Sequence, residues 1–267
     1  MASESLTLAP LRAAPRRWFV SPAALALAVV TPLAVVLAWP HPPDVLRLLW
    51  LWLPYFLEAF LLNILISVVA IGLGTLAGLF LAAAELSSFR LLRFAAAAFV
   101  GVFRNAPLLV LVFAASFALP FEIKVFGVYL QFPDWVKAAA ALTLPAAAHI
   151  AEIFRGAIQS IPSAQWESAT SLAFNRSQSL RWIILPQCIK RALPPWMNLY
   201  STITMGTSLA SLAGVDDLLH AANNASQAVH STDFTIAVFP LVLLCFFLYC
   251  YPISRLTSRL ERRFAVQ

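Results

Sequence analysis

Long apolar stretches separated by short polar segments give this chain its hydropathy pattern. A membrane-spanning helix needs about 20 mostly apolar residues, and six stretches are long enough: residues 19–39, 54–84, 94–119, 136–157, 195–214 and 234–252. Each is a continuous run rich in Ala, Leu, Val and Phe, without the alternation that marks the strands of a membrane barrel. The pattern therefore predicts an all-α membrane protein with six spans.

The polar segment 161–195, between the fourth and fifth stretches, begins with a helix signal. Ser163 follows a proline and is predicted to be the N-cap of a helix that ends near residue 174. One face of this helix places an aromatic residue beside small ones, at Trp166, Ala169, Thr170 and Ala173. Because small side chains let another protein approach closely, this face is predicted to be a docking surface.

A second short helix is predicted in the same segment. Asn175 and Gln178 have the spacing of a capping box, and the helix that they start is expected to end at or before Pro186. A stripe of apolar residues should hold the segment against the membrane helices: Leu180, Ile183 and Ile184. The same pattern fits an amphipathic hairpin resting on the bilayer, and the residues alone leave both interpretations open.

Two features inside the apolar stretches bear on helix packing. Ala70, Gly74 and Gly78 repeat every four residues, a spacing that lets a second helix approach closely in a membrane. Pro107 removes a backbone donor and predicts a kink or a break in the third span.

Charged residues within the spans are few, and each has two interpretations. An Arg at membrane depth is costly, so Arg104 either extends to the inner headgroups or has a structural or pathway role. Glu152 lies three residues before Arg155, which favours a local ion pair near the inner surface. His149, one turn earlier, is expected to be a packed polar residue rather than a ligand.

The composition agrees with a membrane protein and orients it. Apolar residues make up 61% of the 267 and charged residues only 11%, with a mean hydropathy of +0.82. With both termini cytoplasmic, most Lys and Arg residues fall on the cytoplasmic side, as the positive-inside rule requires, and the exceptions outside are Arg47, Lys124 and Lys137. The net charge of +6 then reflects topology and contact with anionic membrane lipid, and no nucleic acid partner is expected.

Signals for a cofactor or a metal are missing from the sequence. The three cysteines are Cys188, Cys245 and Cys250. None is placed to form an extracytoplasmic disulfide, and no Cys/His cluster has metal-ligand spacing. No segment matches the phosphate-binding pattern G-x-x-x-x-G-K-[ST]. No cofactor is therefore expected in this chain, and ATP with its Mg²⁺ would have to bind to a partner subunit.

Several segments resemble a known family. The segment "GAIQSIPSAQWESATSLAFNRSQSLRWIILPQCIKRALPPWMN" resembles the EAA loop of permeases of ATP-binding-cassette (ABC) importers, specifically the polar amino acid (histidine/glutamine type) family. Five more segments resemble that family in the same order: "NILISVVAIGLGTLAGLFLAAAELSSFRLLR", "VFRNAPLLVLVF", "AEIFRGAIQSIP", "TSLASLAGVDDLL" and "SRLERRF". The resemblance runs from about residue 57 to residue 263.

The resemblance implies a type I importer fold. Its five-helix core would occupy residues 54–267 with the coupling loop at 161–195, and residues 1–53 would add a cytoplasmic tail, one extra membrane helix and an external linker. The family pairs two permease subunits, identical or not, above two cytoplasmic ABC ATPases. A periplasmic substrate-binding protein docks outside, where Asp216 and Asp217 form either a docking patch or part of a solvated loop. The chain is then expected in the bacterial inner membrane, with no enzymatic activity of its own.

In this family the EAA loop is the coupling helix that sits in a cleft on each ATPase. The coupling residues that the resemblance implies are Trp166, Glu167, Ser168, Ala169, Ala173, Arg176, Leu185 and Pro186. Glu167 and Ala169 match the Glu and the second Ala of the motif, whereas Ser168 replaces the first Ala. Ala173 replaces the loop glycine of the family and is expected to stiffen the end of the helix.

A second departure concerns the solute. The family usually has Leu-Lys-Asp-Thr-Ser-Leu where this chain has "ITMGTSL", so Met205 and Gly206 replace the Lys and the Asp. That Asp is expected to contact substrate in importers of cationic amino acids, and its loss argues against a cationic ligand held by this chain. The candidate residues of the substrate pathway are Arg104, Glu152, Gly206, Thr207 and Ser208.

The favoured function is the permease subunit of an ATP-driven importer for amino acids or related small polar solutes. An ion-coupled secondary transporter with Glu152, His149 and Arg104 as a relay would need facing membrane acids and an inverted repeat, and the sequence shows neither. A membrane enzyme using Glu152 and His149 as acid and base would also need a nucleophile and oxyanion donors, which the sequence does not supply.

Overall fold

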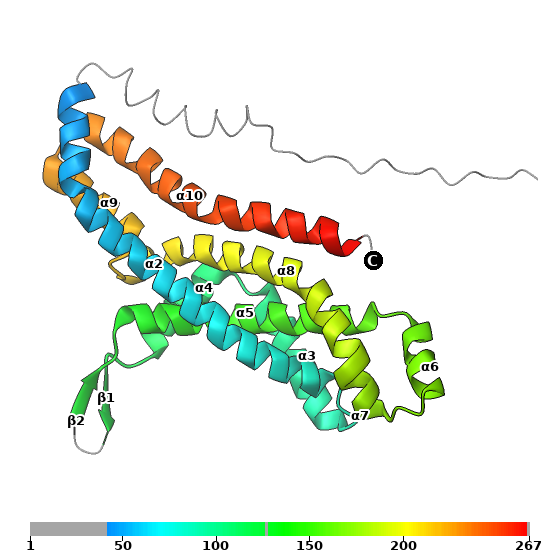
Figure 1. Cartoon of the computed structure of the whole chain (residues 1–267). Coiled ribbons are helices and arrows are strands. Elements are labelled where there is room, and N and C mark those ends of the chain that lie inside the picture. The colour runs from blue at the N-terminus through cyan, green and yellow to red at the C-terminus, as the bar shows by residue number, and fades with distance from the viewer. Residues whose placement is uncertain (1–41, 126–127, 266–267) are drawn as a thin grey trace, which may run out of the picture.

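The computed structural model describes residues 42–125 and 128–265, and Figure 1 labels their helices and strands. Apart from one short hairpin, the described elements are helices. The predicted first span, residues 19–39, lies outside the described residues.

Two long helices cross closely at the centre of the molecule. They are α2, Pro42–Glu85, and α5, Asp134–Gln159. A Cβ built on Gly78 would lie 2.7 Å from the carbonyl oxygen of Ala147, and one built on Gly74 would lie 2.7 Å from the Cβ of Ala146. The predicted close approach at the small residues of α2 is therefore confirmed, because only glycine leaves room for the α5 backbone.

The third predicted span is two helices. Helix α3, Arg90–Asn105, and helix α4, Leu108–Ala118, are bent by 108° at Ala106 and Pro107. Both linking residues have extended backbone, and the Asn105 side chain donates a hydrogen bond of 2.8 Å to the Gly101 carbonyl near the end of α3. The predicted break at Pro107 is confirmed.

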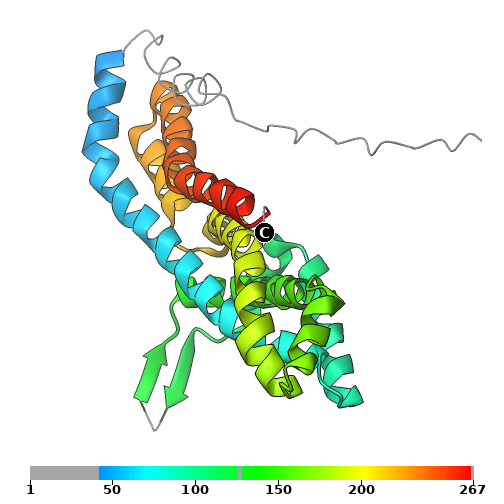
Figure 2. The same cartoon turned by 45° about the vertical axis from the view of Figure 1, so that its right-hand side comes forward.

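A β-hairpin follows α4 and was not predicted. Strands β1, Glu122–Val125, and β2, Val128–Gln131, pair antiparallel and project from the helical body (Figures 1 and 2). The side chain of Lys137 in α5 is fully buried beneath this hairpin, with its ammonium 2.9 Å from Asp134 Oδ1 and 3.7 Å from the centre of the Phe121 ring. The ion pair lies within α5, and the cation–π contact with Phe121 fixes the base of the hairpin to this helix.

The segment after α5 first forms a separate helix, α6, Ser163–Ser171. After a turn, the chain returns as one continuous helical run made of α7, Arg176–Gln178; the π-helix η1, Ser179–Ile184; and α8, Leu185–Gly206. The predicted helix end at or before Pro186 is wrong. In the π-helix the Leu185 N–H donates to the Leu180 carbonyl five residues back, and Pro186 then falls in the first turn of α8, where a missing N–H costs little.

Residues 216–233, expected outside the membrane as a docking patch or a solvated loop, are mostly helix. A 3₁₀ helix η2, Thr207–Ala213, ends at Gly214 in the left-handed conformation, and helices α9, Leu218–Val229, and α10, Thr232–Ala265, follow. Helix α9 buries Leu218 and three alanines against the Phe56 end of α2 and the start of α10. The expectation of a plain solvated loop is therefore wrong, because this segment has an apolar face that packs.

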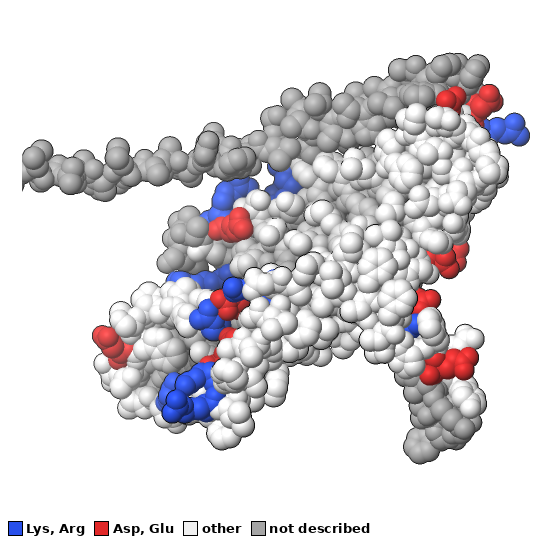
Figure 3. All heavy atoms as spheres, turned by 180° about the vertical axis from the view of Figure 1, so that it is seen from behind, with Lys and Arg blue, Asp and Glu red and all other residues white. Residues whose placement is uncertain are grey.

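The described residues reproduce part of the predicted membrane topology. Helices α2, α5 and α10 are each long and apolar enough to cross a membrane, and α3 with α4 makes a fourth crossing if the bent pair is one span. Helix α8 is not among these helices and carries Lys190 and Arg191 near its start. Figure 3 shows most Lys and Arg of the visible face near the end that carries α7, with a broad uncharged surface beside them.

Candidate coupling loop and polar clusters

Helix α6 turns its aromatic side toward its own chain. Trp166 is half-buried in a cluster that includes Ile161, Ile184 and Cys188, and Ala169 is fully buried. Ala169 therefore has no surface to offer a partner. The predicted docking face is split: Trp166 packs on η1 and α8 and Ala169 is buried, whereas Thr170 and Ala173 are exposed.

The outward side of α6 is small and polar. Its exposed residues include Glu167, Ser168, Thr170, Ser171 and Leu172. The three hydroxyls donate to backbone carbonyls four residues back over 2.7 to 3.0 Å, so they lie close to the helix. Leu172 is 71% exposed, and Glu167 forms no ion pair with any described residue. This surface can accept a partner without first breaking a contact of its own.

The end of α6 places Ala173 in a conformation that favours glycine. The N–H of Phe174 donates to the Ala169 carbonyl at 3.1 Å and the N–H of Ala173 donates to the Thr170 carbonyl at 2.9 Å, which is the Schellman arrangement. Ala173 has φ 59°. A residue with a Cβ in this left-handed region costs about 1 to 2 kcal/mol. The alanine therefore sits at a strained corner instead of lengthening the helix.

The restart after this corner follows the prediction. Asn175 Oδ1 accepts from the Gln178 N–H and Gln178 Oε1 accepts from the Asn175 N–H, both at 2.9 Å, so the capping box is confirmed. Arg176 is exposed in the first turn. The predicted apolar stripe is also confirmed, with its three members packed against the end of α5: Leu180, Ile183 and Ile184.

Two polar contacts tie the loop to α8. Arg191 Nη1 donates to the Ser160 carbonyl at 2.8 Å and to the Ser160 Oγ at 3.1 Å. Gln187 Nε2 donates to Gln165 Oε1 at 3.3 Å. Near them Leu185 is half-buried and Pro186 is exposed. The end of α5, the helix α6 and the start of α8 thus form one connected unit.

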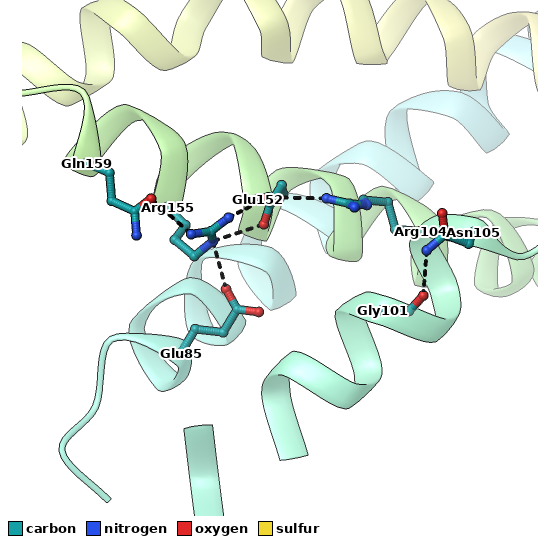
Figure 4. A network of polar contacts seen from close by, with 7 residues as sticks. All are labelled: Glu85, Gly101, Arg104, Asn105, Glu152, Arg155 and Gln159. Atoms are coloured by element: carbon teal, nitrogen blue, oxygen red, sulfur yellow. Dashed lines mark hydrogen bonds and ion pairs between the residues drawn. The ribbon is translucent and has the colours of Figure 1, made fainter. Parts of the chain in front are cut away.

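The charged residues expected in the spans form one network, drawn in Figure 4. Arg104 Nη1 lies 3.2 Å from Glu152 Oε1, and Glu152 also accepts from Arg155 over 2.5 and 3.0 Å. Arg155 donates to Gln159 at 2.9 Å and lies 3.6 Å from Glu85 Oε2. The expected Glu152–Arg155 pair is confirmed. Arg104 joins α3 to α5 at the same carboxylate, so the structural interpretation of Arg104 holds.

The three candidates from the "MGTSL" segment face different surroundings. Gly206 is buried, and a Cβ there would lie 3.3 Å from Leu108 Cδ1, so an acidic side chain has little room. Thr207 is buried, accepts a hydrogen bond from Asn63 at 2.9 Å and donates to the Thr204 carbonyl at 2.7 Å. Ser208 lines a groove of about 660 Å³ between α8 and α10, and none of the described residues that line it is charged.

Asp216 and Asp217, predicted as a possible docking pair, have separate roles. Asp217 is fully buried and caps α9, accepting from the His220 N–H at 2.9 Å and from Asn63 Nδ2 at 3.1 Å. Burial raises the pKa of the Asp217 carboxyl to about 6. Asp217 is therefore wrong as a docking residue. Asp216 has a 78% exposed side chain that lies 3.4 Å from His220 Nε2.

Sequence reasoning missed Asn63 and Glu85. Asn63 lies fully buried within α2, where its side-chain Nδ2 donates to Thr207 and Asp217 and its side-chain Oδ1 accepts from the Leu218 N–H at 2.9 Å. It thereby joins α2 to η2 and α9. The available signal was a lone amide in a long apolar helix, because polar groups at membrane depth need partners.

Comparisons with known proteins agree with this architecture. The family model of the binding-protein-dependent transport system inner membrane component matches residues 74–266. The chain is 33% identical over 213 residues to the probable amino-acid ABC transporter permease YckA of Bacillus subtilis (strain 168), covering 79% of this chain and 90% of YckA. It is 31% identical over 208 residues to the probable glutamine ABC transporter permease GlnM of the same organism, covering 78% and 92%.

Solved structures show the same fold. A crystal structure of an amino acid ABC transporter with histidines has a TM-score of 0.68 and 26% identity, covering 79% of this chain and 95% of that one. The inward-facing MetNI methionine ABC transporter has a TM-score of 0.57 at 17% identity, covering 82% and 98%, and so supports the fold alone. The chain therefore belongs to the binding-protein-dependent transport system inner membrane components, the permease subunits of ABC importers.

Proposed function

We propose that this chain is the permease subunit of an importer for amino acids or related small polar solutes, driven by ATP through the outward face of α6. The supporting observation is that this exposed face belongs to a loop held rigidly on α5 and α8. Families of this kind work with a separate ATPase and a substrate-binding protein. The relatives named above carry amino-acid or glutamine permease names, which supports the solute class.

Force from the ATPase would reach the membrane helices by two routes. The exposed residues between Glu167 and Leu172 would contact a cleft on the ATPase, and the half-buried Trp166 would pass the displacement to α8. The Arg191–Ser160 hydrogen bonds would pass it to the end of α5. The loop would then move as a lever, because its contacts leave little room for local bending.

The solute pathway would follow the uncharged groove between α8 and α10. Ser208 of η2 lines it together with hydroxyl and amide side chains of α8 and aromatic side chains of α10, which suits a solute whose side chain is neutral. The crowded site at Gly206 agrees with the loss of a cationic ligand. Arg104 and Glu152 would hold α3 against α5 and would not line this pathway, since each already has an ionic partner.

We infer a membrane orientation in which α6 lies in the cytoplasm. The basic residues near α7 and along the C-terminal half of α10 would face the anionic inner leaflet. The hairpin and α9 would then face the periplasm, where Asp216 remains an exposed candidate contact for a binding protein. A second permease subunit, identical or not, and two ATPase subunits would complete the complex.

The test is a charge reversal on the outward face of α6. Glu167→Arg should abolish co-purification of the ATPase and ATP-dependent amino acid uptake, while the permease itself stays folded because Glu167 makes no described ion pair. Glu122→Arg is the matched control. It makes the same charge reversal in the exposed hairpin, which lies near the start of α5 and far from α6, and should keep the ATPase bound. Unchanged ATPase binding and uptake in Glu167→Arg would refute the proposal, as would uptake without ATP.

A further inference from the structure

A charged cavity of about 420 Å³ lies where the end of α2 meets α3 and α5, away from the groove and from the outward face of α6. Its ionic lining consists of three guanidinium groups and two carboxylates: Arg93, Arg104, Arg155, Glu85 and Glu152. Uncharged residues complete the wall, with Gly101 and Val100 of α3 on one side and Gln159 of α5 on the other. The cavity therefore offers both signs of charge in a space the size of a small solute.

Glu85 lacks a donor on the wall of this cavity. Its side chain is only 8% exposed, and its Oε2 accepts no hydrogen bond from the described residues. The nearest cation is Arg155, whose Nε lies 3.6 Å away and already donates to Glu152 at 3.0 Å. A buried acceptor without a donor is costly, so the Glu85 carboxylate, which lines the cavity, favours a ligand that brings N–H groups.

The basic side of the cavity has donors to spare. Arg93 is exposed and forms no ion pair with any described residue. Arg104 uses Nη1 for Glu152 and keeps further N–H groups, because a guanidinium carries five. These groups suit a carboxylate, which guanidinium binds with two parallel hydrogen bonds.

We propose that this cavity binds the zwitterionic head group of an α-amino acid, with the ammonium on Glu85 and the carboxylate on Arg93. A phosphate or another anion would be repelled by Glu85 and would leave its oxygen without a donor. A simple amine would be repelled by the three guanidinium groups. Only a ligand that carries an ammonium and a carboxylate on the same carbon satisfies the two sides together.

The position of this site gives it a regulatory consequence. Gln159 on its wall is the last residue of α5, and α6 begins four residues later at Ser163. A ligand that bridges α2, α3 and α5 would hold the joint through which the loop moves. If the proposed function holds, the cavity opens to the cytoplasm, so imported amino acid that accumulates there would bind and slow further transport.

Binding is tested on the purified permease–ATPase complex, without binding protein, by titration calorimetry with the twenty standard amino acids. For the best binder, N-acetylation and conversion to the α-amide should each weaken binding at least ten-fold. Glu85→Gln and Arg93→Gln should also weaken binding at least ten-fold. Arg90→Gln, also exposed on α3 but outside the cavity, should bind normally. Absence of binding by every amino acid, or equal binding by Glu85→Gln, overturns the proposal.

Transport by proteoliposomes separates this site from the proposed function. Amino acid loaded inside should slow ATP-dependent uptake by the native complex several-fold and have no effect on Glu85→Gln. Uptake that depends on ATP but ignores internal amino acid would overturn the site and leave the function standing. Uptake independent of ATP would overturn the function and leave the binding result to decide the site.

Discussion

Replacing Gly78 by alanine tests the close crossing of α2 and α5. The added Cβ would lie 2.7 Å from the Ala147 carbonyl oxygen, 2.7 Å from Ile150 Cβ and 2.8 Å from Ile150 Cγ2. Ordinary contact begins at 3.4 Å, so the two helices would have to separate by about 0.7 Å at the point where they are most tightly packed. The carbonyl is backbone, and it cannot move aside without moving α5.

The expected cost follows from overpacking of a close contact, which is typically about 1 to 3 kcal/mol. Alanine regains up to about 1 kcal/mol over glycine in helix propensity, which offsets only part of the cost. Subtracting the gain in helix propensity from the overpacking cost, Gly78→Ala should lower the free energy of unfolding by up to about 2 kcal/mol.

Thermal unfolding of the detergent-purified protein, followed by fluorescence-detected gel filtration, measures the effect. Gly72→Ala is the matched control, since a Cβ there has no neighbour within 4 Å and should leave the midpoint equal or slightly higher. Equal midpoints for Gly78→Ala and Gly72→Ala would refute the argument that the glycine is required by the helix crossing.

Three further predictions use other sites. Ala173→Gly should relieve about 1 kcal/mol of left-handed backbone strain and slow hydrogen exchange at the end of α6, and faster or unchanged exchange would contradict the strained corner. Asp217 lies between η2 and α9, outside the membrane-spanning helices, and burial raises its pKa from 3.8 to about 6, so the folded state holds this proton more tightly than the unfolded chain. The free energy of unfolding should thus fall by up to about 3 kcal/mol as the pH rises from about 4 to about 6. Asp217→Asn keeps an N-cap acceptor and should make this pH dependence weaker, and parallel plots of unfolding free energy against pH for the two proteins would exclude Asp217 as its origin. Cys188 is fully buried, so maleimide should label it only after denaturation, and peptide mass spectrometry showing equal labelling of the native protein would contradict its packing.

Local signals in the sequence predicted the local structure well. The capping box at Asn175 and Gln178, the break at Pro107 and the close approach at Gly74 and Gly78 each depend on a few neighbouring residues or on one helix face. Such features are set by backbone sterics and short-range hydrogen bonds, which a sequence pattern reports directly.

Features that depend on distant neighbours were missed. The periodicity of α6 identified a face with Trp166 and Ala169, but the pattern does not say whether an apolar face meets a partner or the same chain, and Ala169 is buried by the chain itself. The helix through Pro186 needed a π turn, and α9 needed the Phe56 end of α2 to pack against.

The polar clusters show the same limit. Glu152 and Arg155 are neighbours on one helix, so their ion pair could be predicted. The partners of Arg104 and Asn63 come from other helices, 48 and 154 positions away at Glu152 and Asp217, and only the fold brings them together.

Photo-cross-linking from the outward face of α6 tests the central claim most directly. A photoreactive residue in place of Ser168 should cross-link to the ATPase in membranes that contain the assembled complex, and one in place of Glu122 in the hairpin should not. An ATPase adduct from Ser168 alone is the predicted result. Absence of an adduct from Ser168 in every nucleotide state, with the complex intact, would contradict coupling through this helix.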